Sequence, residues 1–231
     1  MAWGLITNFD DRIKDIVSAY TGDAGGISGV DSNAVQQWLI DGCYDVIEKI
    51  KVTDTGAIEE FVIRSSSWAD GTPQDLDEVR EVTSVERNEY PARSISFSLR
   101  KRVIDSDSIH YATEKDPIFF IGPATDSSAG RKLTLKPDAS GSELGYYYYI
   151  PDYTITSWDN STSSVDNFPK RFYEHIVLYA AVRLLERNYI DLVNQEEDVE
   201  LAQGIAAGIA ILKQRYTEMF MKPDLGVKEW N

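Results

Sequence analysis

The hydrophobic residues of this chain change their spacing twice, and this change limits the possible folds more than any other feature. Apolar residues recur every three or four positions in residues 1–58, alternate with polar residues in 59–155, and return to helical spacing in 156–231. The first period predicts amphipathic helices and the second predicts half-buried strands. We therefore predict an α+β fold, in which the N- and C-terminal segments form one helical bundle and the middle segment is an inserted all-β module, sandwich-like or barrel-like.

The N-terminal segment predicts two helices. The apolar positions of the first are Phe9, Ile13, Ile16, Val17 and Tyr20, and those of the second are Val35, Trp38, Leu39, Val46, Ile47 and Ile50. Thr7 is a candidate cap for the first helix, and Asp31 or Ser32 for the second. The glycine-rich stretch TGDAGGISGV between them lacks the Gly-Lys-Ser/Thr end of a phosphate loop, so we interpret it as a connector.

The middle segment predicts short strands separated by turn-forming residues. The candidate strands are EEFVIRSSS, EVREVTSVER, SISFSLRKRV, SIHYAT, PIFFIG and RKLTLK. In the third of these, Ile95, Phe97 and Leu99 alternate with serines, which is typical of a strand with one face on a core.

The stretch GYYYYIPDYT places four tyrosines in succession near the end of the predicted β module. In a strand, Tyr146 and Tyr148 face one side and Tyr147 and Tyr149 face the other, and Pro151 ends the ladder because it has no N–H group. A ligand platform needs only one exposed aromatic face. Two aromatic faces favour a strand that packs on its own core and also contributes to a protein interface.

Two more helices are predicted after residue 166. Pro169 is placed just inside the start of the first, and the apolar residues that follow predict the central helix of its domain. The last helix, near residues 197–221, carries Gly204 and Gly208, a spacing that lets a neighbouring helix approach closely.

The last eleven residues, MKPDLGVKEWN, support two interpretations. Pro223 cannot continue the preceding helix, so the segment is either a disordered tail or an arm that becomes ordered on another protein chain. Leu225, Val227 and Trp230 favour the arm, because such side chains frequently anchor interfaces. With the four tyrosines, they are the predicted interface residues.

Composition excludes several kinds of function. The net charge of −15 argues against a protein that holds nucleic acid by its phosphates, and the single cysteine excludes an internal disulfide. Two histidines are too few for a multi-histidine metal site, and Asp105 and Asp107 lack the remainder of a calcium loop. No catalytic or cofactor-binding motif is present, and no apolar run has the length of a membrane span. We expect a soluble protein that is not an enzyme and has no cofactor or metal.

The order of these segments resembles the head-to-tail adaptor (connector) proteins of tailed bacteriophages. The resemblance covers nearly the whole chain and is clearest in FPKRFYEHIVLYAAVRLLERNY, where Phe168 and Pro169 precede an aromatic, apolar helix. It implies a virion protein, assembled in the host cytoplasm, that forms a ring of about twelve copies beneath the portal protein in the phage neck. In such a ring the helical domain makes subunit contacts, and the β module faces the periphery or a downstream tail or neck protein. Genomic DNA passes through the acidic channel without specific binding, and no membrane is involved.

Alternatives use other features of the sequence. An enzyme would need carboxylates that the fold brings together, since no catalytic centre is visible in the sequence. The β module and its tyrosines could form a ligand- or carbohydrate-binding module of another tail or host-interaction protein. A nucleic-acid protein would need a basic face, for which Arg100, Lys101 and Arg102 are the candidates.

Overall fold

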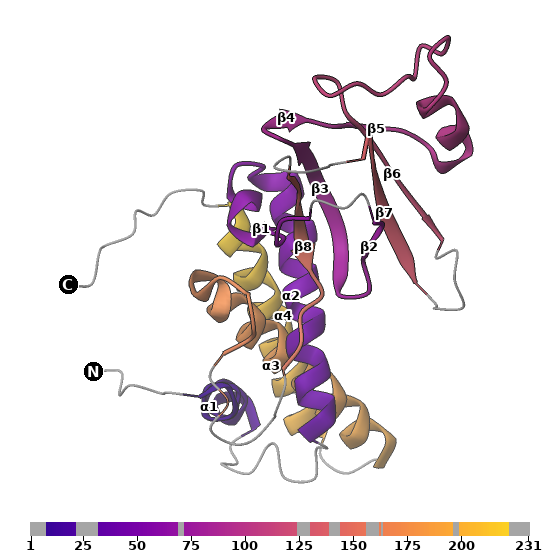
Figure 1. The fold of residues 1–231 in the computed structure, drawn as a ribbon. Coiled ribbons are helices and arrows are strands. Elements are labelled where there is room, and N and C mark those ends of the chain that lie inside the picture. The colour runs from indigo at the N-terminus through magenta and orange to yellow at the C-terminus, as the bar shows by residue number, and fades with distance from the viewer. Residues whose placement is uncertain are drawn as a thin grey trace, which may run out of the picture. The chain divides into compact units, whose positions relative to one another are not determined.

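The protein is a mixed α+β structure with two β-sheets (Figure 1). The computed structural model describes residues 8–21, 32–68, 72–123, 130–138, 144–155, 162, 164–195 and 199–221. The chain divides into two compact units. The helical unit consists of Met1–Phe61 and Tyr153–Asn231, and the β unit consists of Val62–Asp152.

The helical unit is organised around α3. Its helices are α1 (Phe9–Thr21), α2 (Ser32–Thr53), α3 (Tyr173–Gln195) and α4 (Val199–Met221), with the short 3₁₀ helices η1 (Ala57–Phe61) and η3 (Lys170–Phe172). Helix α3 packs against α1, α2 and α4, and Ile176, Ala180 and Leu184 have no exposed surface. This confirms the predicted central helix.

An aromatic cluster joins the two chain segments of the helical unit. Phe168 lies at its centre, with ring centroids 5.5 Å from Phe61, 5.2 Å from Tyr153 and 6.3 Å from Tyr173. The Phe9 ring packs edge-on against Tyr173, at 5.2 Å between centroids. Because aromatic pairs at these distances bury large apolar surfaces, Phe168 links η1, the segment after the last strand, and the start of α3.

The helix starts differ in part from those predicted. Asn8 caps α1, since its side-chain oxygen accepts a hydrogen bond from the Asp11 N–H at 2.7 Å. Thr7 and the side chains of Asp31 and Ser32 lie outside the described residues. The prediction for Pro169 was wrong by one turn, because Pro169 lies before η3 with an extended backbone (ψ 126°) rather than inside α3. Its fixed φ suits this position equally well.

The β unit contains two four-stranded sheets. Sheet A has the strand order β1-β8-β3-β4 and sheet B has the order β2-β7-β6-β5, in which only the β5–β6 pair is parallel. The strands are β1 (Ile63–Arg64), β2 (Gln74–Asp75), β3 (Val79–Arg87), β4 (Tyr90–Pro91), β5 (Arg93–Ser94), β6 (Ile118–Pro123), β7 (Arg131–Lys136) and β8 (Gly145–Pro151).

One core lies between the two sheets and a second lies on the outer face of sheet B. The first contains Trp68, Leu76, Val79, Val85, Phe119, Leu133 and Leu135. The second contains Val103, Ala112, Ile118 and Phe120. Neighbouring residues of β6 thus face different cores, as strand geometry requires, and β6 is covered on both sides.

The strand predicted for SISFSLRKRV was wrong. Only Arg93–Ser94 forms a strand, and Phe97–Val103 forms the 3₁₀ helix η2, capped by the Ser96 hydroxyl, which accepts a hydrogen bond from the Ser98 N–H. The Phe97 ring packs on Phe120 and against Gly122, where a Cβ atom would come within 2.3 Å of the ring. Phe97 and Val103 are six residues apart, which is two turns of a 3₁₀ helix, so both side chains lie on the face of η2 that packs on sheet B.

Two other predicted strands are shorter or missing. Residues 108–110 form a turn, in which the Tyr111 N–H donates to the Ser108 carbonyl, and residues 111–113 are irregular, so His110 lies in a turn rather than a strand. In EEFVIRSSS only β1 is extended, because the preceding residues belong to η1. None of the helices in the described ranges combines the length and the apolar character needed to cross a membrane.

Candidate interaction surfaces

The tyrosine strand β8 has two faces with different surroundings. Tyr147 and Tyr149 pack on the core between the sheets, with their ring centroids 5.1 Å apart. The centroid of the Tyr147 ring also lies 5.7 Å from that of Trp68, and burial raises the pKa of the Tyr147 hydroxyl. These two tyrosines therefore stabilise the β unit itself.

Tyr146 and Tyr148 lie on the opposite face, where charged side chains cover them. The Arg64 guanidinium lies 3.6 Å from the centre of the Tyr146 ring and donates a hydrogen bond to Glu86 at 3.0 Å. The Tyr148 hydroxyl donates to the same carboxylate at 3.1 Å. Because Arg64 occupies the face of Tyr146, a sugar would have to displace a cation–π contact in order to stack there.

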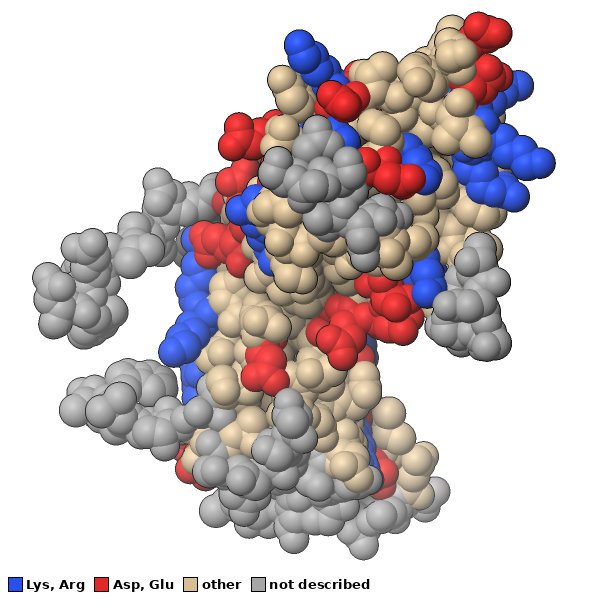
Figure 2. All heavy atoms as spheres, viewed as in Figure 1, with Lys and Arg blue, Asp and Glu red and all other residues tan. Residues whose placement is uncertain are grey.

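A second surface projects from sheet B and consists of residues 97–111, which we name the basic loop. Three consecutive cations, Arg100, Lys101 and Arg102, are exposed on η2. Figure 2 shows Lys and Arg side chains gathered at this corner of the β unit, at the upper right of the view. Ile104 and Ile109 follow with 70% and 88% of their surfaces exposed. The basic loop therefore presents three cations, the carboxylates of Asp105 and Asp107, and large apolar side chains to solvent.

The basic loop is held in place at its base. Val103 and Ala112 are buried against sheet B, and the Ala112 N–H donates to the Val103 carbonyl at 2.9 Å. Arg93 makes two hydrogen bonds of 2.6 Å to Asp116, which lower the pKa of that carboxyl group. A loop fixed in this way loses little conformational entropy when it binds a partner.

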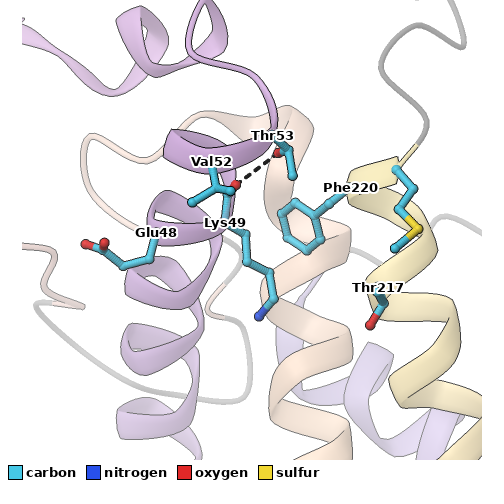
Figure 3. A pocket seen from close by; sticks show the side chains of 7 residues that line it. Glu48, Lys49, Val52, Thr53, Thr217 and Phe220 are labelled. Carbon is cyan, nitrogen blue, oxygen red and sulfur yellow. Dashed lines mark hydrogen bonds between the residues drawn. The ribbon is translucent and has the colours of Figure 1, made fainter.

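A third surface is an apolar groove between the C-terminal ends of α2 and α4, with a volume of about 340 Å³ (Figure 3). Its lining residues are Glu48, Lys49, Val52, Thr53, Thr217, Phe220 and Met221. Val52 and Met221 have 84% and 70% of their surfaces exposed. Such exposure of apolar side chains around a hollow is typical of a surface that binds another molecule.

The polar groups beside the groove already have partners. Lys49 forms an ion pair with Asp45 and lies 4.8 Å from the centre of the Tyr216 ring. The Tyr216 hydroxyl donates to Asp45 at 2.6 Å, and burial raises the pKa of that hydroxyl. Thr53 and Thr217 donate to backbone carbonyls of their own helices. The groove therefore offers apolar contact rather than a nucleophile or a general base.

Cys43 and His175 of the helical unit pack among apolar and aromatic neighbours, the first fully buried and the second half-buried. Cys43 is fully buried, and desolvation raises the pKa of its thiol. His175 packs between Phe172 and Phe220, and burial lowers its pKa to about 4. Within the described ranges, no three His, Cys, Asp or Glu residues are grouped as metal ligands would be.

Of these three surfaces, sequence reasoning named the tyrosine strand as an interface, and that role stays a prediction. The same reasoning placed the four tyrosines of β8, whereas Leu225, Val227 and Trp230 lie outside the described residues. It missed the groove, because Val52 and Phe220 are far apart in sequence. It noted the cations of the basic loop but assigned Ile109 to a strand, and only the fold reveals its exposure.

No protein-family model matches this sequence, and no curated protein is significantly similar to it.

Proposed function

We propose that the protein is a structural component of the neck of a tailed bacteriophage, a head-to-tail adaptor that joins the portal to the tail. The observation that supports this best is the position of Phe168, which lies in the stretch that carries the resemblance and at the centre of the aromatic cluster of the helical unit. In this proposal the two terminal segments form the adaptor domain, and the β unit is an insertion in it.

The surfaces of both units support a role in assembly rather than in catalysis. The groove and the basic loop expose apolar side chains, whereas Cys43 is buried and His175 is half-buried between two aromatic rings. The acidic excess of the chain also suits a ring through which DNA moves, because carboxylates along a channel repel phosphates and limit adhesion.

Binding to a portal ring tests this proposal. We expect the purified protein to co-sediment with the portal of the same phage and to saturate at a fixed ratio of subunits, with little dependence on added DNA. A portal ring from an unrelated phage is the control. Failure to bind the cognate portal at micromolar concentrations contradicts the proposed function.

The C-terminal segment provides a second test of the same function. If residues 223–231 form an arm that binds the portal, their deletion weakens portal binding and leaves the melting temperature of the free protein unchanged. Trp230→Ala alone reproduces much of this loss, about 2 kcal/mol or more, because tryptophan is a frequent interface anchor. Unchanged portal affinity of the truncated protein contradicts the arm.

A further inference from the structure

We propose that residues 222–231, which follow α4, fold back and bind the α2–α4 groove of their own copy, with Leu225 and Val227 as the apolar contacts. The occupant is thus a segment of this chain that lies outside the described residues. The contact goes beyond the proposed function and does not rest on it, because it concerns the free protein before it meets a portal.

The groove lies where the chain leaves α4. Phe220 and Met221, the last two residues of α4, both belong to its lining. In Figure 3 the Phe220 ring points from α4 toward the end of α2. Leu225 follows Met221 by four residues, and four residues of extended chain span at most about 14 Å. Leu225 and Val227 are therefore within reach of the groove.

Pro223 prevents α4 from continuing past the groove. Proline has no N–H group for the helix ladder, and it disfavours helical backbone at the residue before it, which is Lys222. Prolines are common just beyond helix ends, and an apolar residue after the end frequently packs back on the last turn. Leu225 is the first large apolar residue after Pro223 and is a candidate for such a contact.

The covalent connection and the charge of the segment favour it over a separate molecule. A short linker gives residues 222–231 an effective concentration near the groove of about 1 mM, about a thousandfold above a partner at micromolar concentration. These residues contain two basic and two acidic side chains and are neutral overall, whereas the chain carries −15. The segment therefore does not meet the repulsion that opposes the approach of a second copy or of an anionic surface.

The chemistry of the groove suits an uncharged, apolar occupant. Lys49 is paired with Asp45, and Glu48 is paired with Lys51, so both charged residues of the lining have partners on α2 itself. The surface that an occupant covers is apolar, above all Val52, which is 84% exposed. A hollow of about 340 Å³ is at the small end of the range of binding pockets and suits a few side chains rather than a helix.

Cysteine cross-linking in the full-length chain tests the contact. The test variant carries Val52→Cys and Leu225→Cys, and oxidised glutathione is added at micromolar protein concentration. The native Cys43 does not interfere, because it is fully buried and desolvation raises the pKa of its thiol. We expect an internal disulfide, visible as a monomer of altered mobility on a non-reducing gel, to form at least about tenfold faster than in the control variant.

The control variant carries Ile190→Cys with Leu225→Cys. Ile190 is 55% exposed and lies near the end of α3 that leads into α4, and the 23 residues of α4 are about 34 Å long. Leu225 cannot span that distance from Met221, so this pair should stay reduced. Adding Val227→Asp to the test variant should slow its disulfide to the control rate, whereas adding Trp230→Ala should leave the rate unchanged.

Thiol labelling gives an independent measurement. Val52→Cys alone should react with a maleimide at least about threefold more slowly in the full-length chain than in a chain that lacks residues 222–231, because the bound segment covers it. Ile190→Cys should react equally in both chains. An occupied groove also predicts that the deletion lowers the melting temperature of the free protein, whereas an arm that is free until it meets the portal predicts no change.

Three results overturn the proposal. A disulfide that forms no faster than in the control, or labelling of Val52→Cys that is unaffected by the deletion, shows that the groove is open in the free protein. A cross-linked band of twice the monomer mass assigns the groove to the segment of another copy. Portal binding of the wild-type protein is measured separately, so this contact and the proposed function can fail independently.

Discussion

The side chain of Ile176 lies at the centre of the helical unit with no exposed surface. Ile176→Asp places an unpaired charge among α1, α2 and α4, and we expect it to lower the free energy of unfolding by about 4 kcal/mol. Ile190→Asp is the control on the same helix, because Ile190 is 55% exposed and should lose less than about 1 kcal/mol. Urea unfolding measures both, and equal losses contradict the central position of α3.

His175 makes the stability of the helical unit depend on pH. Its pKa falls from 6.5 to about 4 on folding, chiefly because burial disfavours the charged ring. The neutral ring therefore stabilises the fold fully above about pH 6.5, and this contribution is lost as the pH falls toward 4. His175→Phe should lose less stability than the wild-type chain between pH 7 and pH 4.5 in urea titrations. If both proteins lose the same stability between pH 7 and pH 4.5, His175 is not the cause of the pH dependence.

At the scale of the elements, Gly204 and Gly208 of α4 lie four residues apart but differ in how closely a neighbouring helix approaches them. A Cβ atom at Gly208 would lie 2.4 Å from the Tyr20 ring of α1, whereas none of the residues that the structure describes comes within 4 Å of the same position at Gly204. The prediction that both glycines admit a neighbouring helix was therefore right for Gly208 and wrong for Gly204. The same substitution should have opposite effects at the two positions.

Gly208→Ala should destabilise the helical unit by about 1–3 kcal/mol, because Tyr20 must move. Gly204→Ala should stabilise it by about 0.5–1 kcal/mol, since alanine restricts the unfolded chain and favours the helix. Thermal melting of both variants measures the difference. The close packing of α1 on α4 is contradicted if the two variants melt at the same temperature.

The sequence predicts best those elements in which the spacing of apolar residues keeps one period along most of the element. Helix α3 and strands β3, β6, β7 and β8 fall largely within the predicted segments. SISFSLRKRV was mistaken for a strand because Ile95, Phe97 and Leu99 alternate with polar residues, and the three-residue period of a 3₁₀ helix is hard to recognise over so short a stretch. Two features favour the 3₁₀ helix over a strand: the Ser96 cap, and the space beside Gly122 that receives the Phe97 ring. The space beside Gly122 exists only in the folded protein, because Gly122 belongs to sheet B.

The candidate surfaces were harder to predict than the elements, for a physical reason. A strand with tyrosines on both faces can be recognised from one segment, as β8 was. The groove depends on how the ends of α2 and α4 meet, and the exposure of Ile104 depends on how η2 packs on β6. Both are properties of tertiary packing, which local periodicity does not encode.

For the whole molecule, the net charge predicts that the protein binds DNA weakly or not at all. A protein of net charge −15 whose basic loop carries three consecutive exposed cations should show no measurable binding to a short duplex at physiological salt. Gel-shift titration measures this, with a low-salt series to expose any electrostatic contribution. Tight, salt-sensitive retention that disappears in the Lys101→Glu, Arg102→Glu variant would instead indicate a nucleic-acid protein.

The central claim is that copies of this chain form a ring on the portal, and electron microscopy of the protein mixed with its portal tests that claim most directly. We predict a ring of about twelve copies, coaxial with the portal and surrounding an open channel wide enough for duplex DNA. Single copies that leave the portal bare, or assemblies without a continuous channel, would contradict the account.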